Sequence, residues 1–472
     1  MKEVKTDICV IGGGSGGLSV AAGAVQMGAK VVLCEGGEMG GDCLNYGCVP
    51  SKAMIEASRV IYHTKKAHKF GIEIDGVQPD YKKVQQHVKN VIAKIAPHDS
   101  VERFEGLGVT VIKEYAQLVD RYTVKAGETI IKAKYIVLAT GSQAKVPPIK
   151  GLDEVNYYTN ENIFDISEKP QKLIVLGGGP IGVELAQAHT LLGCEVTIVE
   201  AFSDILSFAD SDCRNVILNG FKELGINVVT NAKVQEIYKD NDTIYVKTDI
   251  NVYSGTHLLV ATGREPNIKK LNLEEIGIVH TEKGVTVDSS LRTNYKNIYA
   301  IGDIAGPYQF THAAGYHAGI VIQNMLFKLP AKVGYKSFPF VVYTTPELAQ
   351  TGMSISEAEK QSAKILTIDY GSNDRAQANL STEGLVKVAV DKKGYILGAT
   401  IVGESAGELI NEWTIAIKNK FKIKQMTSHI VAYPTLSELN KRVAGSYFTP
   451  MLYSKKVKII VRILLKIFGK RI

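Results

Sequence analysis

The chain has 472 residues, 45% of them hydrophobic and 22% charged, which is typical of a globular protein with a full core and excludes a disordered or fibrous chain. Six cysteines are too few for the disulfide framework of a small secreted scaffold. Seven of the 55 basic residues lie between Lys455 and Arg471, which leaves 48 basic against 48 acidic residues elsewhere, so we expect no nucleic-acid partner.

The N-terminal segment, MKEVKTDICVIGGGSGG, is polar and then enters a glycine-rich turn. It lacks the apolar stretch and the small-residue cleavage site of a signal peptide. The chain contains no run of ~18 uncharged apolar residues, the length that a membrane-spanning helix needs. We therefore expect a cytoplasmic protein in a reducing setting, where a cysteine pair is more often catalytic or metal-binding than structural.

The first predicted strand–helix–strand unit is DICVIGGGSGGLSVAAGAVQMGAKVVLCE, in which Gly12, Gly14 and Gly17 have the G-x-G-x-x-G spacing after an apolar strand. The first glycine allows a sharp turn, the second lets the backbone approach a pyrophosphate, and the third lets helix and strand pack closely. The pyrophosphate would lie on the helix N-terminus. Glu35, at the end of the second strand, is placed to accept a hydrogen bond from a ribose hydroxyl.

The next stretch, GGDCLNYGCVPSK, contains Cys43 and Cys48 separated by four residues. A helix whose first turn holds Pro50 would stabilise a thiolate at Cys48, and Lys52 adds positive charge, so the pKa of Cys48 should fall. The pair alone leaves three interpretations open: metal ligands, a structural disulfide, or a redox-active pair. A zinc site needs a second ligand pair. The other cysteines offer none, and we expect no metal site; they are Cys9, Cys34, Cys194 and Cys213.

The glycine pattern returns in KLIVLGGGPIGVELAQAHTLLGCEVTIVE, as Gly177, Gly179 and Gly182, with Glu200 at the end of the second strand. A carboxylate there binds a free ribose diol and repels a 2′-phosphate, so we expect NAD(H) to be preferred over NADP(H). Two dinucleotide sites on one chain suggest one tightly held cofactor and one that exchanges with solvent.

Three further segments each end an apolar strand on a glycine. In YIVLATGSQAKVP the strand ends at Thr140-Gly141, and in LLVATGREPN it ends at Gly263. In NIYAIGDIAG it ends at a glycine followed by Asp303, where an acid could bind a polyol chain. Each alone would be an ordinary strand-to-loop turn. Together they indicate that both nucleotide domains close in the same way.

The region after Phe338 changes character. It has alternating apolar strands, a Lys-Lys-Gly hairpin turn and a long helix, within the segments FVVYTTPELAQTGMSISEAEK and LVKVAVDKKGYILGATIVGESAGELINEWTIAIKNKF. The chain ends in SKKVKIIVRILLKIFGKRI, where a basic residue recurs every four positions from Lys458 to Lys470. Such a helix suits an anionic membrane surface. Equally, it could pack on its own dimer with its lysines reaching solvent.

These patterns predict an α/β protein with two Rossmann-like dinucleotide-binding domains and an α+β C-terminal domain. Two such sites suit a flavin enzyme fed by a nicotinamide, so the FAD-binding part would be discontinuous, formed by residues 1–149 and 267–336, and the NAD-binding part would be residues 150–266. Residues 337–450 resemble a dimerisation domain, and residues 451–472 would form the basic amphipathic tail.

From about Thr6 to about Tyr447 the chain resembles the class I, FAD-dependent pyridine nucleotide–disulfide oxidoreductases, which include dihydrolipoamide dehydrogenase, glutathione reductase and mercuric reductase. The most specific motif is the cysteine pair followed by V-P-S-K. The resemblance implies that Cys43 is the outer thiol that meets the substrate and Cys48 the inner thiol that forms a charge-transfer complex with the flavin. It further implies site roles for Lys52 beside the flavin paired with Glu184, for Asp303 at the ribityl chain, and for the backbone of Ala116 and Ala313 near the FAD.

The resemblance also implies a mechanism. NADH reduces the flavin, the flavin opens the Cys43–Cys48 disulfide, and the dithiol reduces an acceptor such as a small disulfide, a metal ion or a quinone. Within this family the alternative is dihydrolipoamide dehydrogenase, which runs the relay in reverse. From another class, the chain could be a redox-inactive scaffold that only binds FAD. A homodimer is expected, because the family completes its site with the partner subunit.

The chain departs from the family pattern at three positions. Family members that act on dithiols read approximately H-P-T-x-S-E near the C-terminus, whereas this chain reads YPTLSE, with Tyr433 in the histidine's place and Glu438 retained. Histidine titrates near ~6.5 and tyrosine near ~10, so tyrosine is a poor base at neutral pH. Mercuric reductases also have tyrosine there but end in a cysteine pair, and here no cysteine follows Cys213.

Two further positions differ from the family. Pro180 replaces a tyrosine common in relatives, and Asp42 replaces a threonine and adds negative charge beside the Cys43–Cys48 pair. The chain therefore fits neither type fully; it looks closest to the mercuric-reductase-like group, whose acceptor these motifs do not define.

Overall fold

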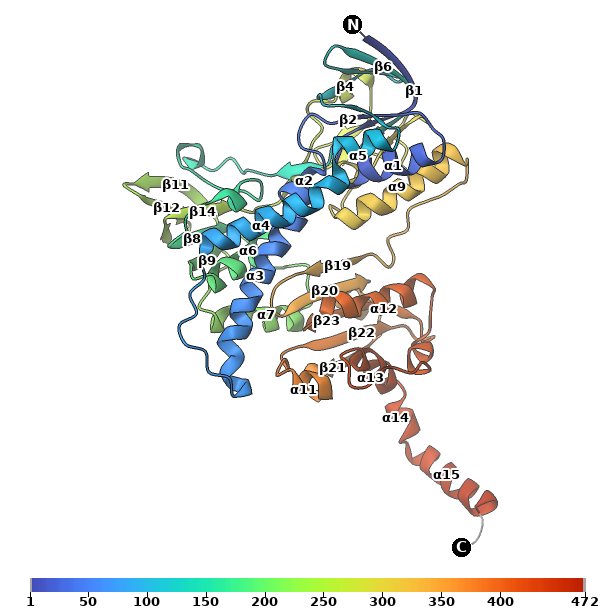
Figure 1. Ribbon diagram of the computed structural model, residues 1–472. Helices are drawn as coiled ribbons and strands as arrows, with labels where there is room; N and C mark the ends of the chain where they lie inside the picture. The colour runs from blue at the N-terminus through green and yellow to red at the C-terminus, as the bar shows by residue number, and fades with distance from the viewer. Residues whose placement is uncertain (1, 470–472) are drawn as a thin grey trace. The chain divides into compact units, whose positions relative to one another are not determined.

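The computed structural model describes residues 2–469, which form two compact units (Figure 1). The first contains residues 2–68, Ile72–Ile205 and Gly225–Val333, and the second Lys69–Gly71, Leu206–Leu224 and residues 334–469. The basic residues Lys470 and Arg471 of the tail lie outside the described part. How the first unit divides into FAD and NAD parts stays a prediction.

The first unit is built on a seven-stranded sheet in the order β3-β2-β1-β6-β5-β4, with β18 also paired to β6. Strands β1 to β3, β6 and β18 are parallel, and β4 and β5 add an antiparallel extension. Helices α1 and α9 lie side by side (Figure 1) and share one apolar core with the sheet. The bounds are β1 Lys2–Ile11, α1 Ser15–Gln26, β2 Val31–Cys34, β3 Thr110–Ile112, β4 Ala116–Asp120, β5 Thr123–Ala126, β6 Thr129–Leu138, β18 Ile298–Ala300 and α9 Thr311–Leu326.

Four helices connect β2 to β3: α2 Gly41–Asn45, α3 Cys48–Lys66, α4 Tyr81–Ile95 and α5 Val101–Gly106. The expected helix after the cysteine pair is therefore present as α3, and it begins at Cys48 with Pro50 in its first turn. Proline fits there because the N–H that it lacks would have no intrahelical partner. Helix α3 packs against both α4 and α6.

A second, four-stranded parallel sheet has the order β10-β9-β8-β14 and carries helix α6. Its elements are β8 Lys172–Leu176, α6 Pro180–Leu191, β9 Glu195–Val199, β10 Asn227–Val229 and β14 His257–Val260. An antiparallel three-stranded sheet packs beside it, formed by β11 Val234–Asp240, β12 Thr243–Thr248 and β13 Val252–Gly255. Smaller pieces complete the unit: β7 Ser142–Ala144, β15 Arg264–Pro266, α8 Leu273–Ile276, β16 His280–Thr281 and β17 Gly284–Val285.

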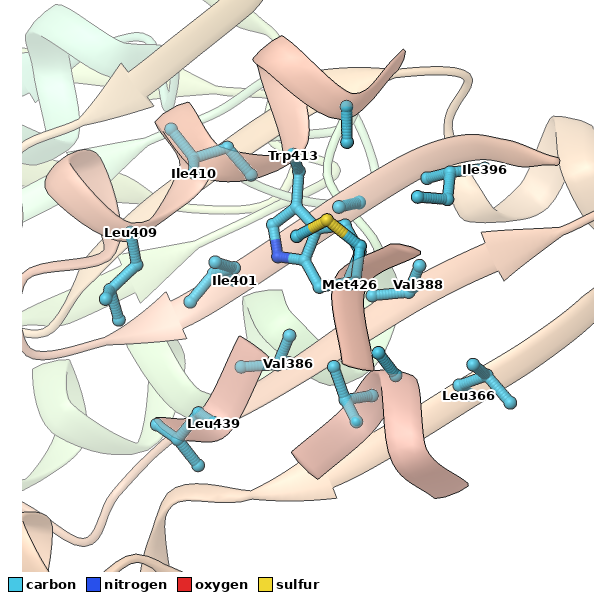
Figure 2. Packing of buried hydrophobic residues seen from close by; sticks show 14 of the residues in the cluster. Leu366, Val386, Val388, Ile396, Ile401, Leu409, Ile410, Trp413, Met426 and Leu439 are labelled. Atoms are coloured by element: carbon cyan, nitrogen blue, oxygen red, sulfur yellow. The ribbon is translucent and has the colours of Figure 1, made fainter. Parts of the chain in front are cut away.

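The second unit contains an antiparallel five-stranded sheet in the order β19-β20-β23-β22-β21. Its core surrounds Trp413 (Figure 2), whose indole N–H donates to Asn440 Oδ1 at 2.7 Å. The expected hairpin and long helix are present as β22, β23 and α12. The bounds are α7 Ser211–Glu223, β19 Pro339–Val342, β20 Glu347–Gly352, α10 Ile355–Lys360, β21 Lys364–Asp369, α11 Asp374–Ala378, β22 Leu385–Val390, β23 Ile396–Gly403, α12 Ala406–Lys418 and α13 Glu438–Ser446.

Helix α7 lies within the sequence assigned to the NAD part but packs in the second unit. Asp210 caps the helix by accepting from the backbone N–H groups of Asp212 and Cys213. The ammonium of Lys387, on β22, lies 2.8 Å from the Asp210 carboxylate and 2.5 Å from that of Asp212. These ion pairs attach α7 to the antiparallel sheet.

The chain continues from α13 into α14 (Thr449–Leu452) and α15 (Lys455–Phe468), so the helix expected in the tail is present. Ser454 begins α15 by accepting a hydrogen bond from the Val457 backbone N–H at 3.4 Å. Across residues 2–469, none of the helices combines the length and apolar character needed to cross a bilayer.

Candidate active site

The two glycine loops have the same geometry. Gly12 and Gly177 have φ of +111° and +107°, and a Cβ on either would lie within 2.4 Å of a backbone oxygen of the neighbouring strand end. A Cβ on Gly17 would lie 1.9 Å from the Gly12 carbonyl oxygen, and one on Gly182 would lie 2.0 Å from that of Gly177. Only glycine therefore permits these turns and this close helix packing.

Both loops leave space in front of a helix that has no side-chain cap. Helices α1 and α6 begin after Gly14 and Gly179, and these N-cap glycines form no side-chain hydrogen bond with the first turn. A Cβ on Gly14 would meet only Gly41 Cα, at 3.8 Å, and one on Gly179 would meet nothing within 4 Å. Uncapped N–H groups that face open space are what a dinucleotide pyrophosphate requires, so the residues fit the FAD and the nicotinamide cofactor.

The acid at the end of each second strand bonds to its glycine loop. The Glu35 carboxylate accepts from the backbone N–H groups of Gly13 and Gly37, each at 2.5 Å. The Glu200 carboxylate accepts from Gly178 N–H at 2.6 Å and Phe202 N–H at 2.9 Å. Both acids thus lie beside the loops, where the sequence predicted a ribose contact; that contact stays a prediction.

The cysteine pair lies where α2 meets α3. Cys43 is in α2 and half-buried, Cys48 is the first residue of α3 and exposed, and their thiols form a hydrogen bond with each other. Cys48 Sγ is also 3.3 Å from the Thr311 hydroxyl, at the start of α9. The other four cysteines are buried, as expected for core thiols. Among the described residues no group of three or more His, Cys, Asp and Glu side chains could hold a metal ion.

The two thiols differ in acidity. The hydrogen bond from Cys43, with help from Thr311 and the positive charge of Lys52, lowers the pKa of Cys48 to about 6. The same hydrogen bond and burial raise the pKa of Cys43 far above its usual range. In the reduced pair at neutral pH the negative charge therefore lies on Cys48, in the direction that the sequence predicted.

The ion pair expected between Lys52 and Glu184 is present. The Lys52 ammonium lies 3.0 Å from the Glu184 carboxylate, so α3 and α6 are joined beside the cysteine pair. The Glu184 side chain is 6% exposed and that of Lys52 37% exposed. A buried carboxylate is costly without such a partner, and the pair fixes the lysine one turn after Cys48.

An unexpected network surrounds Asp42. Its carboxylate lies 3.0 Å from the Arg264 guanidinium and accepts from the Asn160 amide at 3.0 Å. Arg264 also donates to Ser142 Oγ at 2.8 Å, and Ser142 donates to Asp303 at 2.5 Å. The sequence interpretation missed Arg264, Asn160 and Ser142. For Arg264 the only signal was its place next to the Ala-Thr-Gly strand end.

The remaining cofactor candidates lie at ends of strands and helices. Asp303 follows β18, and burial raises its pKa. Thr140 and Asn267 exchange hydrogen bonds of 2.8 and 2.9 Å, which joins the strand ends after β6 and β15. The others are Gly141 and Gly263, both with positive φ, and Ala116 and Ala313, buried at the starts of β4 and α9.

Tyr433 and Glu438 lie in the second unit. Tyr433 is 70% exposed, and its hydroxyl donates to the Asp374 carboxylate at 3.1 Å. That hydrogen bond raises the pKa of Tyr433, so an even smaller fraction of the side chain is in the basic phenolate form at neutral pH than in a free tyrosine. Glu438 begins α13. Their expected contribution to the partner subunit's cysteine pair stays a prediction.

Two family models match the chain. The model described as "Pyridine nucleotide-disulphide oxidoreductase" matches residues 6–318, and the dimerisation domain of the same family matches residues 338–444. A dihydrolipoyl dehydrogenase from Chlamydia pneumoniae is 34% identical over 92% of this chain and 95% of the relative. A mercuric reductase from Bacillus cereus is 31% identical over 92% of this chain and 70% of the relative.

Solved structures agree with these matches. The Cu(II) complex of RclA, an HOCl-induced flavoprotein disulfide reductase from Escherichia coli, has a TM-score of 0.85 at 27% identity, covering 92% of this chain and 99% of that one. LpdA from Mycobacterium tuberculosis has a TM-score of 0.87 at 25% identity, covering 94% and 99%. The matched dimerisation domain supports a homodimer. The chain belongs to the pyridine nucleotide–disulphide oxidoreductase family.

Proposed function

We propose that the protein is an FAD-dependent oxidoreductase that passes two electrons from NAD(P)H to a disulfide between Cys43 and Cys48, and from the resulting dithiol to an external acceptor. The observation that carries this proposal is the asymmetric cysteine pair, with a thiolate-forming Cys48 at the start of α3 and the Lys52–Glu184 ion pair one turn away. In this proposal the enzyme is a cytoplasmic homodimer.

In the proposed site the first loop, with Gly12, Gly14 and Gly17, binds the FAD pyrophosphate, and Asp303 holds its polyol chain. FAD supplies the two-electron link between the nicotinamide and the cysteine sulfurs. Lys52 adds positive charge on the sulfur side, and Thr311 bonds to Cys48. The second loop, with Gly177, Gly179 and Gly182, binds the nicotinamide cofactor. Glu200 would repel a 2′-phosphate, and this charge supports a preference for NAD(H) over NADP(H).

The chain's own residues determine where the proton goes. Opening the disulfide takes two electrons and, at neutral pH, one proton, because Cys48 remains a thiolate while Cys43 becomes a thiol. Cys43 then lies on the outer side of the pair and meets the acceptor. Oxidation of the pair by the acceptor releases the proton and restores the disulfide.

The acceptor that fits best is a metal ion, as in the mercuric-reductase group, with a small disulfide as the other candidate. Similar proteins include a mercuric reductase and a reductase solved with Cu(II). Tyr433 in place of a histidine favours an acceptor that needs no proton transfer from that position. Dihydrolipoamide dehydrogenase remains the alternative within the family, because a relative with that name is 34% identical and is covered over 95% of its length.

The decisive experiment is an anaerobic titration of the purified protein with NADH and, separately, NADPH, followed by absorbance. We expect NADH to act at lower concentration and to produce a long-wavelength thiolate–flavin band, which Cys48→Ser abolishes and Cys43→Ser preserves. Complete bleaching of the flavin without that band would remove the cysteines from the electron path. A colourless protein without FAD would favour a binding-only scaffold of another class.

A further inference from the structure

Helix α15 exposes apolar side chains around most of its circumference. None of its residues is buried, and eight large apolar side chains are between 46% and 78% exposed, namely Ile459, Ile460, Val461, Ile463, Leu464, Leu465, Ile467 and Phe468. Soluble proteins rarely leave so continuous an apolar surface in water unless it binds something. Because Ser454 caps the helix, this surface begins at a defined residue.

The remaining surface of α15 is a narrow basic stripe. Lys458, Arg462 and Lys466 recur every four residues and therefore share one face. At about 100° per residue, Ile460, Leu464 and Ile467 lie on the opposite face. No acidic residue follows Glu438 in the chain. The helix thus combines a wide apolar face with positive charge along one edge.

The length of the helix decides how it could meet a membrane. Its 14 residues give about 21 Å at ~1.5 Å per residue, shorter than the ~30 Å hydrocarbon core of a bilayer. It is therefore too short to span, but it can lie along the interface with its apolar face in the acyl region and its stripe among the headgroups. A large apolar face with lysine and arginine on the polar side is the pattern of such interfacial helices.

The charge of α15 indicates what binds its apolar face. A second copy of α15 packed through the apolar face would leave both basic stripes on the outside without a negative partner, because the helix has no carboxylate. Anionic lipid supplies both an apolar medium and negative charge at the same depth. We infer that α15 is an amphipathic anchor that binds the surface of an anionic lipid membrane and carries the enzyme with it. This binding does not depend on the proposed electron relay.

The test is sedimentation of the full-length, flavin-loaded protein with vesicles of phosphatidylcholine, with and without phosphatidylglycerol. We expect strong binding only to the anionic vesicles, weaker at high salt. The triple variant Lys458→Gln, Arg462→Gln, Lys466→Gln removes the charge of the stripe. It should weaken binding to the anionic vesicles about a hundredfold, since each charge contributes roughly fivefold. The apolar variant Ile460→Ser, Leu464→Ser and Ile467→Ser keeps the charge and should weaken binding at least roughly tenfold.

A matched control removes equal charge elsewhere. Lys283, Lys392 and Lys393 are exposed and lie outside the tail helix, so their triple glutamine variant should bind like the wild type. Equal binding to neutral vesicles, or unchanged binding after deletion of residues 455–472, would overturn the inference. So would loss of dimers on that deletion without any vesicle binding, because the helix would then cover a second copy. Flavin reduction by NADH, measured on the same variants, reports separately on the electron relay.

Discussion

At the scale of single residues, the acidity of Cys48 has a direct chemical consequence. Its lowered pKa means that the thiolate persists at neutral pH and becomes protonated as the pH falls through about 6. In the reduced, flavin-free protein we therefore expect alkylation of Cys48 by iodoacetamide to reach half its maximal rate near that pH, whereas an ordinary cysteine does so near ~8.5. The measurement is the amount of alkylated Cys48 peptide against pH.

The causes of this shift can be separated by substitution. Cys43→Ala removes its largest cause, and Lys52→Met removes a smaller electrostatic one, so both should move the alkylation midpoint of Cys48 upward, the first by more. An unchanged midpoint in Cys43→Ala would show that the hydrogen bond does not determine the acidity of Cys48.

Asp42 acts on the same thiol in the opposite direction. Its negative charge raises the pKa of Cys48, although Arg264 and Asn160 both bind the carboxylate. Asp42→Asn should therefore lower the alkylation midpoint of Cys48 and increase labelling at pH values below it. Glu38→Gln makes the same charge change four residues upstream and serves as the control. Equal shifts in both variants would contradict a specific effect of Asp42.

The Lys52–Glu184 pair should contribute to stability. Glu184→Leu leaves the Lys52 ammonium without its carboxylate, and we expect the free energy of unfolding to fall by about 1–2 kcal/mol. This is below the ~3–5 kcal/mol of a fully buried pair, since Lys52 is partly exposed. Chemical denaturation measures the change. The double variant Lys52→Met, Glu184→Leu should recover most of it, and failure to recover would mean that the loss is one of packing.

At the scale of elements, the two glycine loops allow a paired experiment. An alanine at Gly17 or at Gly182 would place a Cβ about as close to a backbone oxygen in each loop. Gly17→Ala should abolish FAD retention, whereas Gly182→Ala should retain the flavin and lose reduction by NADH. Flavin absorbance and stopped-flow reduction measure the two effects. Loss of flavin in both variants would mean that the second loop is not a separate nucleotide site.

The elements also show what the sequence could predict. The glycine loops, their terminal acids, the hairpin before Ile396 and the tail helix depend on local chemistry, and all were predictable. The Asp42 network was not, because Arg264 and Asn160 are more than a hundred residues from it in sequence and converge only through folding. The sequence predicted a negative charge at Asp42 beside the cysteine pair, whereas in the structure the Arg264 guanidinium and the Asn160 amide bind its carboxylate. Local patterns thus specify elements and leave their long-range polar contacts undetermined.

At the scale of the whole molecule, the identity of residue 433 should determine the acceptor. If Tyr433 of the partner subunit meets the outer thiol, Tyr433→His restores a base that titrates near neutral pH. We expect turnover with a small disulfide to rise by roughly a hundredfold, while flavin reduction by NADH is unchanged. Steady-state rates and single-turnover reduction distinguish the two steps. An equal change in the turnover rate and in the rate of flavin reduction would show that Tyr433 does not act specifically on reduction of the acceptor.

The ion pairs of Lys387 with Asp210 and Asp212 have a consequence for exchanging parts between relatives. Helix α7 lies within residues 150–266, the predicted NAD-binding part, yet it packs on the antiparallel sheet. No single crossover point in the sequence therefore separates the two units. A chimera that takes residues 337–450 from a relative keeps the two aspartates but loses the lysine unless the donor also has one there. Recombination within this family should therefore succeed when Leu206–Leu224 travels with the C-terminal region or when the donor has a lysine at the position of Lys387.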